Sequence, residues 1–157
     1  MSQASEGDGS VQNPAQAASG GQALAAAGSR SASGAGSGVA PVQMADLRAF
    51  ELNVYSAAGG AGATLDVWIQ QCIDGTNWDD IAHYPQVLGN SGGGQWIATF
   101  TVRQRDQAGE MHQMRDATLA AGQVVDSMLG RCFRAKWVIA GGGTFGFQVL
   151  AFARTCN

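Results

Sequence analysis

Four oxygen-bearing side chains crowd one short stretch of the sequence and raise the question of a calcium site. Asp74, Asn77, Asp79 and Asp80 lie within CIDGTNWDDI at residues 72–81. An EF-hand loop places its oxygen ligands at alternate positions counted from its first Asp. Trp78 occupies one of those positions, and an indole offers no oxygen. We therefore interpret the stretch as the solvated tip of a β-hairpin and predict no metal.

The histidines and cysteines do not combine into a catalytic or zinc-binding motif. His83 and His112 are the only histidines, and neither has a second ligand at a zinc-like spacing. Cys72, Cys132 and Cys156 form an odd set without a C-x-x-C pair. Nothing local supports a Cys–His nucleophile, and no G-x-S-x-G motif is present. We predict no enzymatic activity, catalytic residue or cofactor. We expect reduced cysteines, with one disulfide plus a free thiol as the alternative.

Tryptophan is frequent for a chain of this length, and one Trp is expected on the outer face of a strand. If Leu65, Val67 and Ile69 face the core, Trp68 points the other way on the same strand. An outward Trp marks either a subunit interface or a platform on which a sugar ring stacks. Trp and Arg are typical anchors of protein interfaces. The candidate interface residues are Trp68, Trp78, Arg103, Arg105 and Arg134.

The element that positions these residues is a hairpin expected over residues 65–81. The apolar alternation described above predicts a strand with one buried face. Asp74-Gly75-Thr76-Asn77 supplies turn chemistry, because Gly75 adopts positive φ without a steric cost and the flanking polar side chains bond the backbone. Trp78 and Ile81 then restart the apolar pattern, so we expect the chain to fold back as a second strand.

Further alternating runs predict an all-β domain. They cover residues 50–54, 96–102, 133–139 and 145–151. The last two flank Gly141-Gly142-Gly143, and we expect them to form a second hairpin. Residues 106–122 are expected to form a long loop or to include one short helix. A further short strand is expected to start at Val124 and Val125 and to end at Leu129-Gly130. The number and spacing of these runs indicate an antiparallel β-sandwich or jelly roll of about 6–8 strands.

The first 41 residues differ from the rest in composition. They consist mainly of Ala, Gly and Ser, contain no aromatic residue, and carry three charges, Glu6, Asp8 and Arg30. Such a segment buries too little apolar surface to offset its ordering entropy when it is alone. We therefore predict an extended, low-complexity N-terminal arm over residues 1–41 that orders along a partner surface, and a β-sandwich domain over residues 42–157. A flexible tail without a role is the alternative.

Composition excludes several classes of partner. The net charge of −3 provides no basic surface, so we predict no direct contact with nucleic acid. No apolar run approaches the ~18 residues of a membrane span, and the first residues do not read as a secretory signal. Only 13% of the residues are charged, which suits a surface that lies against other protein.

Two stretches carry a resemblance to a known group, CIDGTNWDDI at residues 72–81 and RCFRAKWVIAGGGTFGFQV at residues 131–149. They are similar to small β-rich structural proteins of tailed bacteriophages, although Cys72-Ile73 replaces the more usual polar residues before the turn. The resemblance covers residues 45–155. It implies a capsid decoration or cement protein that lies on the capsid surface of the virion and is made in the host cytoplasm. It implies binding to the major capsid protein and to neighbouring copies, with a homotrimer favoured, and stabilisation of the shell through oligomer and arm contacts.

Two alternatives stay open. The outward Trp68 and the jelly-roll pattern also fit a carbohydrate-binding or adhesin-like module, since DGT-x-W hairpins occur in sugar-binding sandwiches. A tail or neck component of the same virion would use the same fold in a different place. The sequence does not distinguish these locations.

Overall fold

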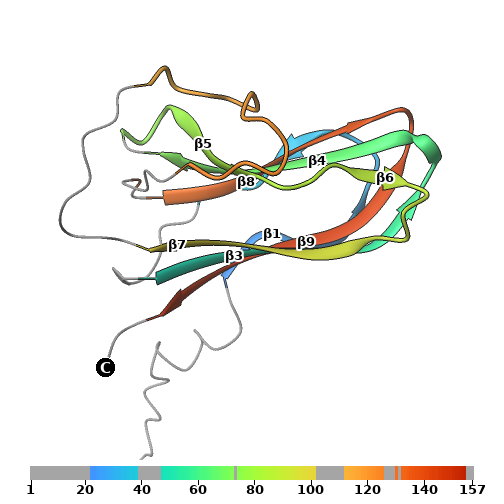
Figure 1. Cartoon of the computed structure of the whole chain (residues 1–157), viewed down its shortest axis with the longest axis horizontal. Helices are drawn as coiled ribbons and strands as arrows, with labels where there is room; N and C mark the ends of the chain where they lie inside the picture. Colours follow the sequence, from blue (N-terminus) through green and yellow to red (C-terminus); the bar gives the residue numbers. More distant parts are fainter. Residues whose placement is uncertain are drawn as a thin grey trace, which may run out of the picture.

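The described part of the chain forms two antiparallel β-sheets that face each other (Figure 1). The structure is a computed structural model, and it describes residues 22–38, 47–72, 74–101, 112–125, 130 and 132–154. The predicted all-β sandwich is thereby confirmed. Among the described residues there is no helix that could span a membrane.

The first sheet, sheet A, has four strands in the order β1-β9-β3-β7. They are β1 (Gln22–Arg30), β9 (Thr144–Arg154), β3 (Leu47–Ala58) and β7 (Gly94–Thr101). All neighbours are antiparallel. Strand β3 lies inside the sheet and pairs with β7 on one side and with β9 on the other. Strands β1 and β7 therefore form the two edges of sheet A.

The second sheet, sheet B, has five strands. Four of them follow the order β2-β8-β4-β5, and β6 pairs with the opposite end of β4. They are β2 (Gly34–Ala35), β8 (Cys132–Ala140), β4 (Gly60–Cys72), β5 (Trp78–His83) and β6 (Val87–Gly89). The predicted hairpin over residues 65–81 is confirmed as the antiparallel pair β4–β5.

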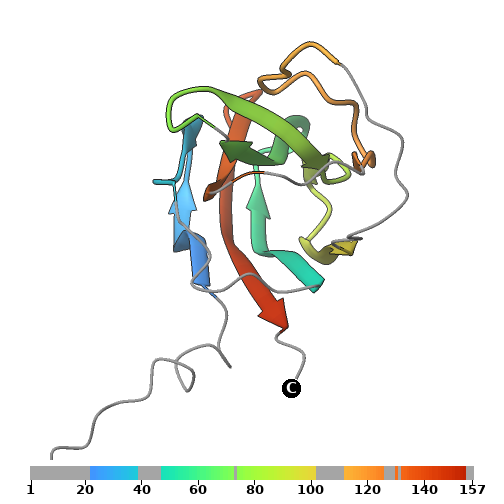
Figure 2. The same cartoon turned by 90° about the vertical axis from the view of Figure 1, so that its left-hand side faces the viewer.

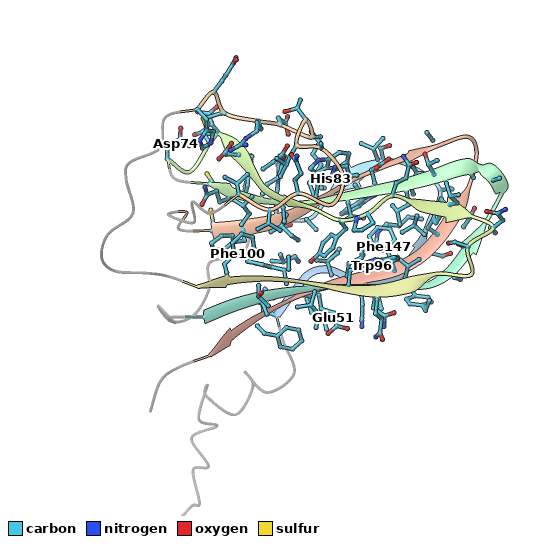
Figure 3. The ribbon with its side chains drawn as sticks, viewed as in Figure 1. Glu51, Asp74, His83, Trp96, Phe100 and Phe147 are labelled. Atoms are coloured by element: carbon cyan, nitrogen blue, oxygen red, sulfur yellow. The ribbon has the colours of Figure 1, made fainter. Side chains whose placement is uncertain are left out.

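Aromatic side chains fill the space between the sheets (Figure 3). The ring of Phe50 contacts Phe100 of the same sheet and Phe133 of the facing sheet, with centroids 5.6 and 5.4 Å apart. Phe145 and Phe147 are fully buried. These residues occupy the apolar positions of the alternating runs, so the period-2 pattern identifies the inner faces of the strands.

Residues 22–38 belong to the sandwich, although they were expected in the arm. Strand β1 pairs with β9, and Leu24 is buried in the core. The chain then crosses to sheet B, where β2 pairs with β8, and so closes one side of the sandwich (Figure 2). A Cβ on Gly34 would lie 2.9 Å from the ring of Trp137. The small residues thus allow this segment to approach its neighbours closely.

The late glycine turn joins different sheets, so the predicted second hairpin is wrong. Strand β8 pairs with β4 in sheet B, whereas β9 pairs with β3 in sheet A. Gly141 and Gly142 have φ of 70° and 71° and lie between these strands. Positive φ lets the chain reverse direction, but it does not decide whether the second strand returns beside the first or across the sandwich.

Candidate functional site

Residues 112–125 lie over the outer face of sheet B (Figure 1, orange). The segment contains no regular helix and follows the free edge of β5 through backbone hydrogen bonds. The Asp80 N–H donates to the Arg115 carbonyl at 2.9 Å, and the Val125 N–H donates to the Ile81 carbonyl at 2.8 Å. The segment, hereafter the cover segment, therefore protects both an edge and an outer face of sheet B. Of the short strand expected to start at Val124, the described residues show one bridge, between Val124 and Ala82 of β5, and residues 126–129 lie outside the described residues.

A buried carboxylate anchors the middle of the cover segment. Asp80 is 0% exposed. One of its oxygens accepts the N–H of Ala117 at 3.1 Å, and the other accepts those of Thr118 and Leu119 at 2.8 and 3.1 Å. The amide of Gln70 also donates to Asp80, at 2.8 Å. A carboxylate with several charge-assisted hydrogen bonds is tolerated in a buried position, so this group fixes the main chain of the cover segment.

The hydrogen-bond network continues from β4 to β8. Gln70 also donates to Asp116 at 2.8 Å and accepts a bond from the Arg134 Nε at 2.8 Å. The Lys136 ammonium donates to Asp116 at 2.7 Å. Hydrogen bonds from Lys136 and Gln70 lower the pKa of Asp116. The Gln70 amide thus links Asp80 and Asp116 to Arg134, and Lys136 holds Asp116 from β8, so the network ties the cover segment to sheet B.

A second carboxylate anchors the start of the cover segment. Asp79 accepts the backbone N–H of Arg115 at 2.9 Å and contacts the His112 Nε2 at 2.9 Å. The Arg115 guanidinium lies 3.7 Å from the same carboxylate. Burial opposes ionisation of Asp79, but these hydrogen bonds outweigh it and lower its pKa. Asp79 and Asp80 are therefore neighbouring residues that hold consecutive parts of one segment.

Trp68 lies on the outer face of sheet B, as predicted, but it is only 6% exposed. Its ring stacks on His83 with centroids 4.0 Å apart, and its Nε1 donates to the Leu119 carbonyl at 3.1 Å. The cover segment therefore occupies the position that a sugar ring or a partner subunit would take on an exposed Trp68.

His83 is enclosed by two acceptors. Its Nδ1 lies 2.7 Å from the Leu119 carbonyl, and its Nε2 lies 3.1 Å from a carboxylate oxygen of Asp66. A carbonyl oxygen only accepts, so the Nδ1 donates to Leu119. Burial opposes ionisation of Asp66, but hydrogen bonds from His83 and Gln86 outweigh it and lower its pKa. Because both ring nitrogens are engaged, neither of them faces a nucleophile as a general base would.

The structure brings together two of the predicted interface residues. The Arg134 guanidinium lies over the Trp78 ring, with the Cζ 4.2 Å from the ring centroid, and Trp78 is partly exposed. Trp68 lies under the cover segment and makes no exposed surface with this pair. Arg103 and Arg105 lie outside the described residues.

The four oxygen-bearing residues near the hairpin tip do not share a site. Asp74 accepts the N–H groups of Thr76 and Asn77, both at 2.8 Å, and so closes the exposed turn. These two N–H bonds lower the pKa of Asp74. Asp79 and Asp80 instead point to the cover segment. The turn uses Asp74 as a backbone acceptor, in keeping with a hairpin tip.

None of the residues that the structure describes lies over the outer face of sheet A, hereafter the open face, in contrast to that of sheet B. Ile97 of β7 is 66% exposed and Tyr55 of β3 is 51% exposed. Leu150 lies in the same row as Ile97, across Glu51. Figure 3 shows Glu51 on the side of the sheet that faces away from the core. Glu51 is the only charged residue among the described outward side chains of β3, β7 and β9.

The sequence predicts neither the cover segment over the outer face of sheet B nor the open outer face of sheet A. The polar anchors Gln70, Asp79 and Asp80 were assigned to a strand and a hairpin tip, and a cover for the sheet was not predicted. The exposed position of Ile97 was available from the alternation, because it falls between the inward-facing Trp96 and Ala98. An apolar residue at an outward position was the available signal for an interface.

Comparison with models of protein families, with curated protein sequences and with solved structures found no match for this chain.

Proposed function

We propose that this chain is a structural protein of a bacteriophage particle, a decoration or cement protein that binds the assembled capsid shell. The observation that carries the proposal is the open outer face of sheet A, with Ile97 and Tyr55 exposed and Glu51 as its one described charge. Depletion of charged residues, together with aromatic and apolar residues, is typical of the core of a protein interface. The resemblance of residues 72–81 and 131–149 to phage structural proteins points to the kind of particle.

The open face is suited to a flat protein partner. Its strands present a regular sheet surface, and two such surfaces can pack about 10 Å apart. Ile97, Leu150 and Tyr55 supply apolar contact area, and Gln95, Asn53 and Gln148 in the adjacent row supply hydrogen-bonding groups. We assign this face to contacts with neighbouring copies, in a homotrimer, and with the major capsid protein.

Binding to the shell would stabilise it by mass action. A protein that binds the assembled lattice, and not the separated subunits, adds its binding free energy to the assembled state. In this proposal residues 1–21, which precede an edge strand of sheet A and lie outside the described residues, make a second contact with the shell. Two linked contacts bind more tightly than either alone because the second one forms at high effective concentration.

The proposal is tested by placing a charge at the centre of the open face. Ile97→Lys should reduce co-sedimentation of the protein with shells of the same phage that lack it, and should shift the oligomer toward monomer in multi-angle light scattering. Leu88→Lys is the matched control, because Leu88 is 38% exposed but lies on β6 in sheet B. Wild-type binding and assembly by the Ile97→Lys variant would overturn the assignment of this face. Normal assembly of the wild type with binding to purified tails, and not to shells, would place the protein in the tail.

The arm is tested with a truncation that spares the sandwich. Removal of residues 1–41 would delete β1 and β2, so the informative variant lacks only residues 1–21. We expect this variant to fold with the same circular dichroism spectrum and to occupy shells less than the full chain. Full occupancy by the truncated protein would exclude a role of the arm in binding.

A further inference from the structure

Two cysteines face each other at one end of sheet B. Cys72 is the last residue of β4, Cys132 is the first residue of β8, and the two are directly opposite in the antiparallel register. The Cys132 Sγ lies 3.9 Å from the Cys72 carbonyl oxygen, and the Cys72 thiol lies within hydrogen-bonding reach of the Cys132 thiol. Both are free thiols in the structure. A chain with three cysteines thus places two of them side by side.

The backbone geometry of this pair permits a covalent bond. Residues directly opposite in antiparallel strands have Cα atoms about 4.5 or 5.5 Å apart, depending on the type of pair. A disulfide spans Cα separations of about 4.4–6.8 Å. The bond can therefore form without separation of the strands.

We propose that Cys72 and Cys132 are a thiol modification site, a pair that forms a reversible cross-strand disulfide with a small disulfide such as oxidised glutathione as the oxidant. Cys132 is partly exposed, whereas Cys72 is 0% exposed, so the reaction begins at Cys132. The Cys132 thiolate attacks one sulfur of the small disulfide and releases one small thiolate. The Cys72 thiolate then attacks the Cys132 sulfur and releases the second. Two protein thiols are oxidised, one small disulfide is reduced, and the two protons end on the two small thiols.

The surroundings of the pair set its reactivity. Burial and the neighbouring Cys72 thiol raise the pKa of Cys132. Since the thiolate is the nucleophile, oxidation is slow at neutral pH and accelerates as the pH rises toward the raised pKa. The Gly75 N–H donates to the Cys72 Sγ at 3.0 Å and holds this sulfur at the end of the strand. The Cys72 thiol also donates to Asp74, at 3.7 Å. Loss of that long bond on oxidation costs little because Asp74 is exposed and keeps its turn contacts.

The consequence would be a covalent link between two segments that are 60 residues apart. The thiols stay reduced in a glutathione-buffered cytoplasm and form the link in oxidising surroundings. The link would tie the end of β4, next to the hairpin turn, to the start of β8. The proposal does not depend on the function proposed above.

The test uses the full-length chain treated with oxidised glutathione at pH 8.5, followed by alkylation of the remaining thiols and peptide mapping without reduction. We expect a single cross-linked peptide pair that contains Cys72 and Cys132, removed by dithiothreitol, and slower formation at pH 7. In the Cys156→Ser variant, Cys72 and Cys132 should both be oxidised to the disulfide, so that no thiol remains to be alkylated. The Cys72→Ser variant should instead stop at a glutathione adduct on Cys132. A Cys156→Ser protein that keeps both thiols, or a cross-link to Cys156 in the wild type, would overturn the proposal. The peptide map of the wild type decides even if a variant does not fold.

Discussion

Removal of the Asp80 carboxylate should release the cover segment from sheet B. Asp80→Ala leaves four donors without their acceptor: three backbone N–H groups and the Gln70 amide. Each unsatisfied buried donor costs about 1–3 kcal/mol, although the sum is limited because the cover segment can lift and expose its donors to water. Loss of one partner from a buried charged network typically costs about 3–5 kcal/mol. We therefore expect the free energy of unfolding to fall by about 4 kcal/mol, a large part of the roughly 5–15 kcal/mol of a typical domain.

Two measurements together test this reasoning. Urea denaturation gives the change in unfolding free energy, and hydrogen exchange reports on the backbone amides of residues 117–119. Both should change in Asp80→Ala, with exchange at these amides faster than in the core strands. Glu51→Ala is the matched control, because this carboxylate lies on the open face and its contact with Gln95 is long, 3.5 Å. The control should change stability by no more than about 0.5 kcal/mol. If Asp80→Ala lowers the free energy of unfolding by less than about 1 kcal/mol and leaves exchange at residues 117–119 unchanged, the Asp80 carboxylate does not anchor the cover segment.

Two further predictions concern the glycine turn and acid stability. Gly142→Ala should lower the free energy of unfolding by about 1–2 kcal/mol, because alanine is strained at the φ of 71° found there. The loss should be no larger because the added Cβ would meet no atom within 4 Å. Gly141→Ala should cost at least about 3 kcal/mol, since the added Cβ would also overlap the Gly62 carbonyl. Equal urea midpoints for the two variants would contradict this account. Asp66 and Asp79 have pKa values below their ordinary 3.8, so the unfolded chain binds more protons in acid. The contribution of these two carboxylates to the free energy of unfolding should be constant above about pH 5. It should decline as the pH falls through 3.8 toward their lowered pKa values. Urea titrations from pH 7 to pH 3 should show this decline, and Asp79→Asn should reduce it.

The alternation of large apolar residues was sufficient to predict most strands of the sandwich. Phe50, Phe133 and Phe147 lie at period-2 positions, and each one faces the core. The partners of these strands could not be predicted from the pattern, because a glycine turn fits both a hairpin and a crossing between sheets. Strand β1 was missed because its small residues leave Leu24 as its one large apolar side chain. Its burial depends on close approach to β9, which no local pattern reveals.

The candidate surfaces were predictable only in part. The outward direction of Trp68 followed from the alternation, but its cover did not. The cover segment has no apolar period. It is held by the packing of Leu119 and Val125 on Trp68 and by polar contacts, such as those of Asp80, between residues far apart in sequence. The sequence predicts Trp78 and Arg134 as interface residues but does not predict that they stack, which follows from the pairing of β4 with both β5 and β8.

The pairing of β1 with β9 determines when the domain can complete its fold. Arg30 lies opposite Phe145, so one edge of sheet A joins segments from opposite ends of the described chain. During synthesis β1 leaves the ribosome long before its partner exists, and its backbone groups must stay solvated or bind elsewhere until β9 emerges. Closing so long a loop slows folding relative to a domain built from local contacts. The nascent chain therefore passes through a stage in which the strand that later seals the sandwich is still free, and the core beneath it is open to water.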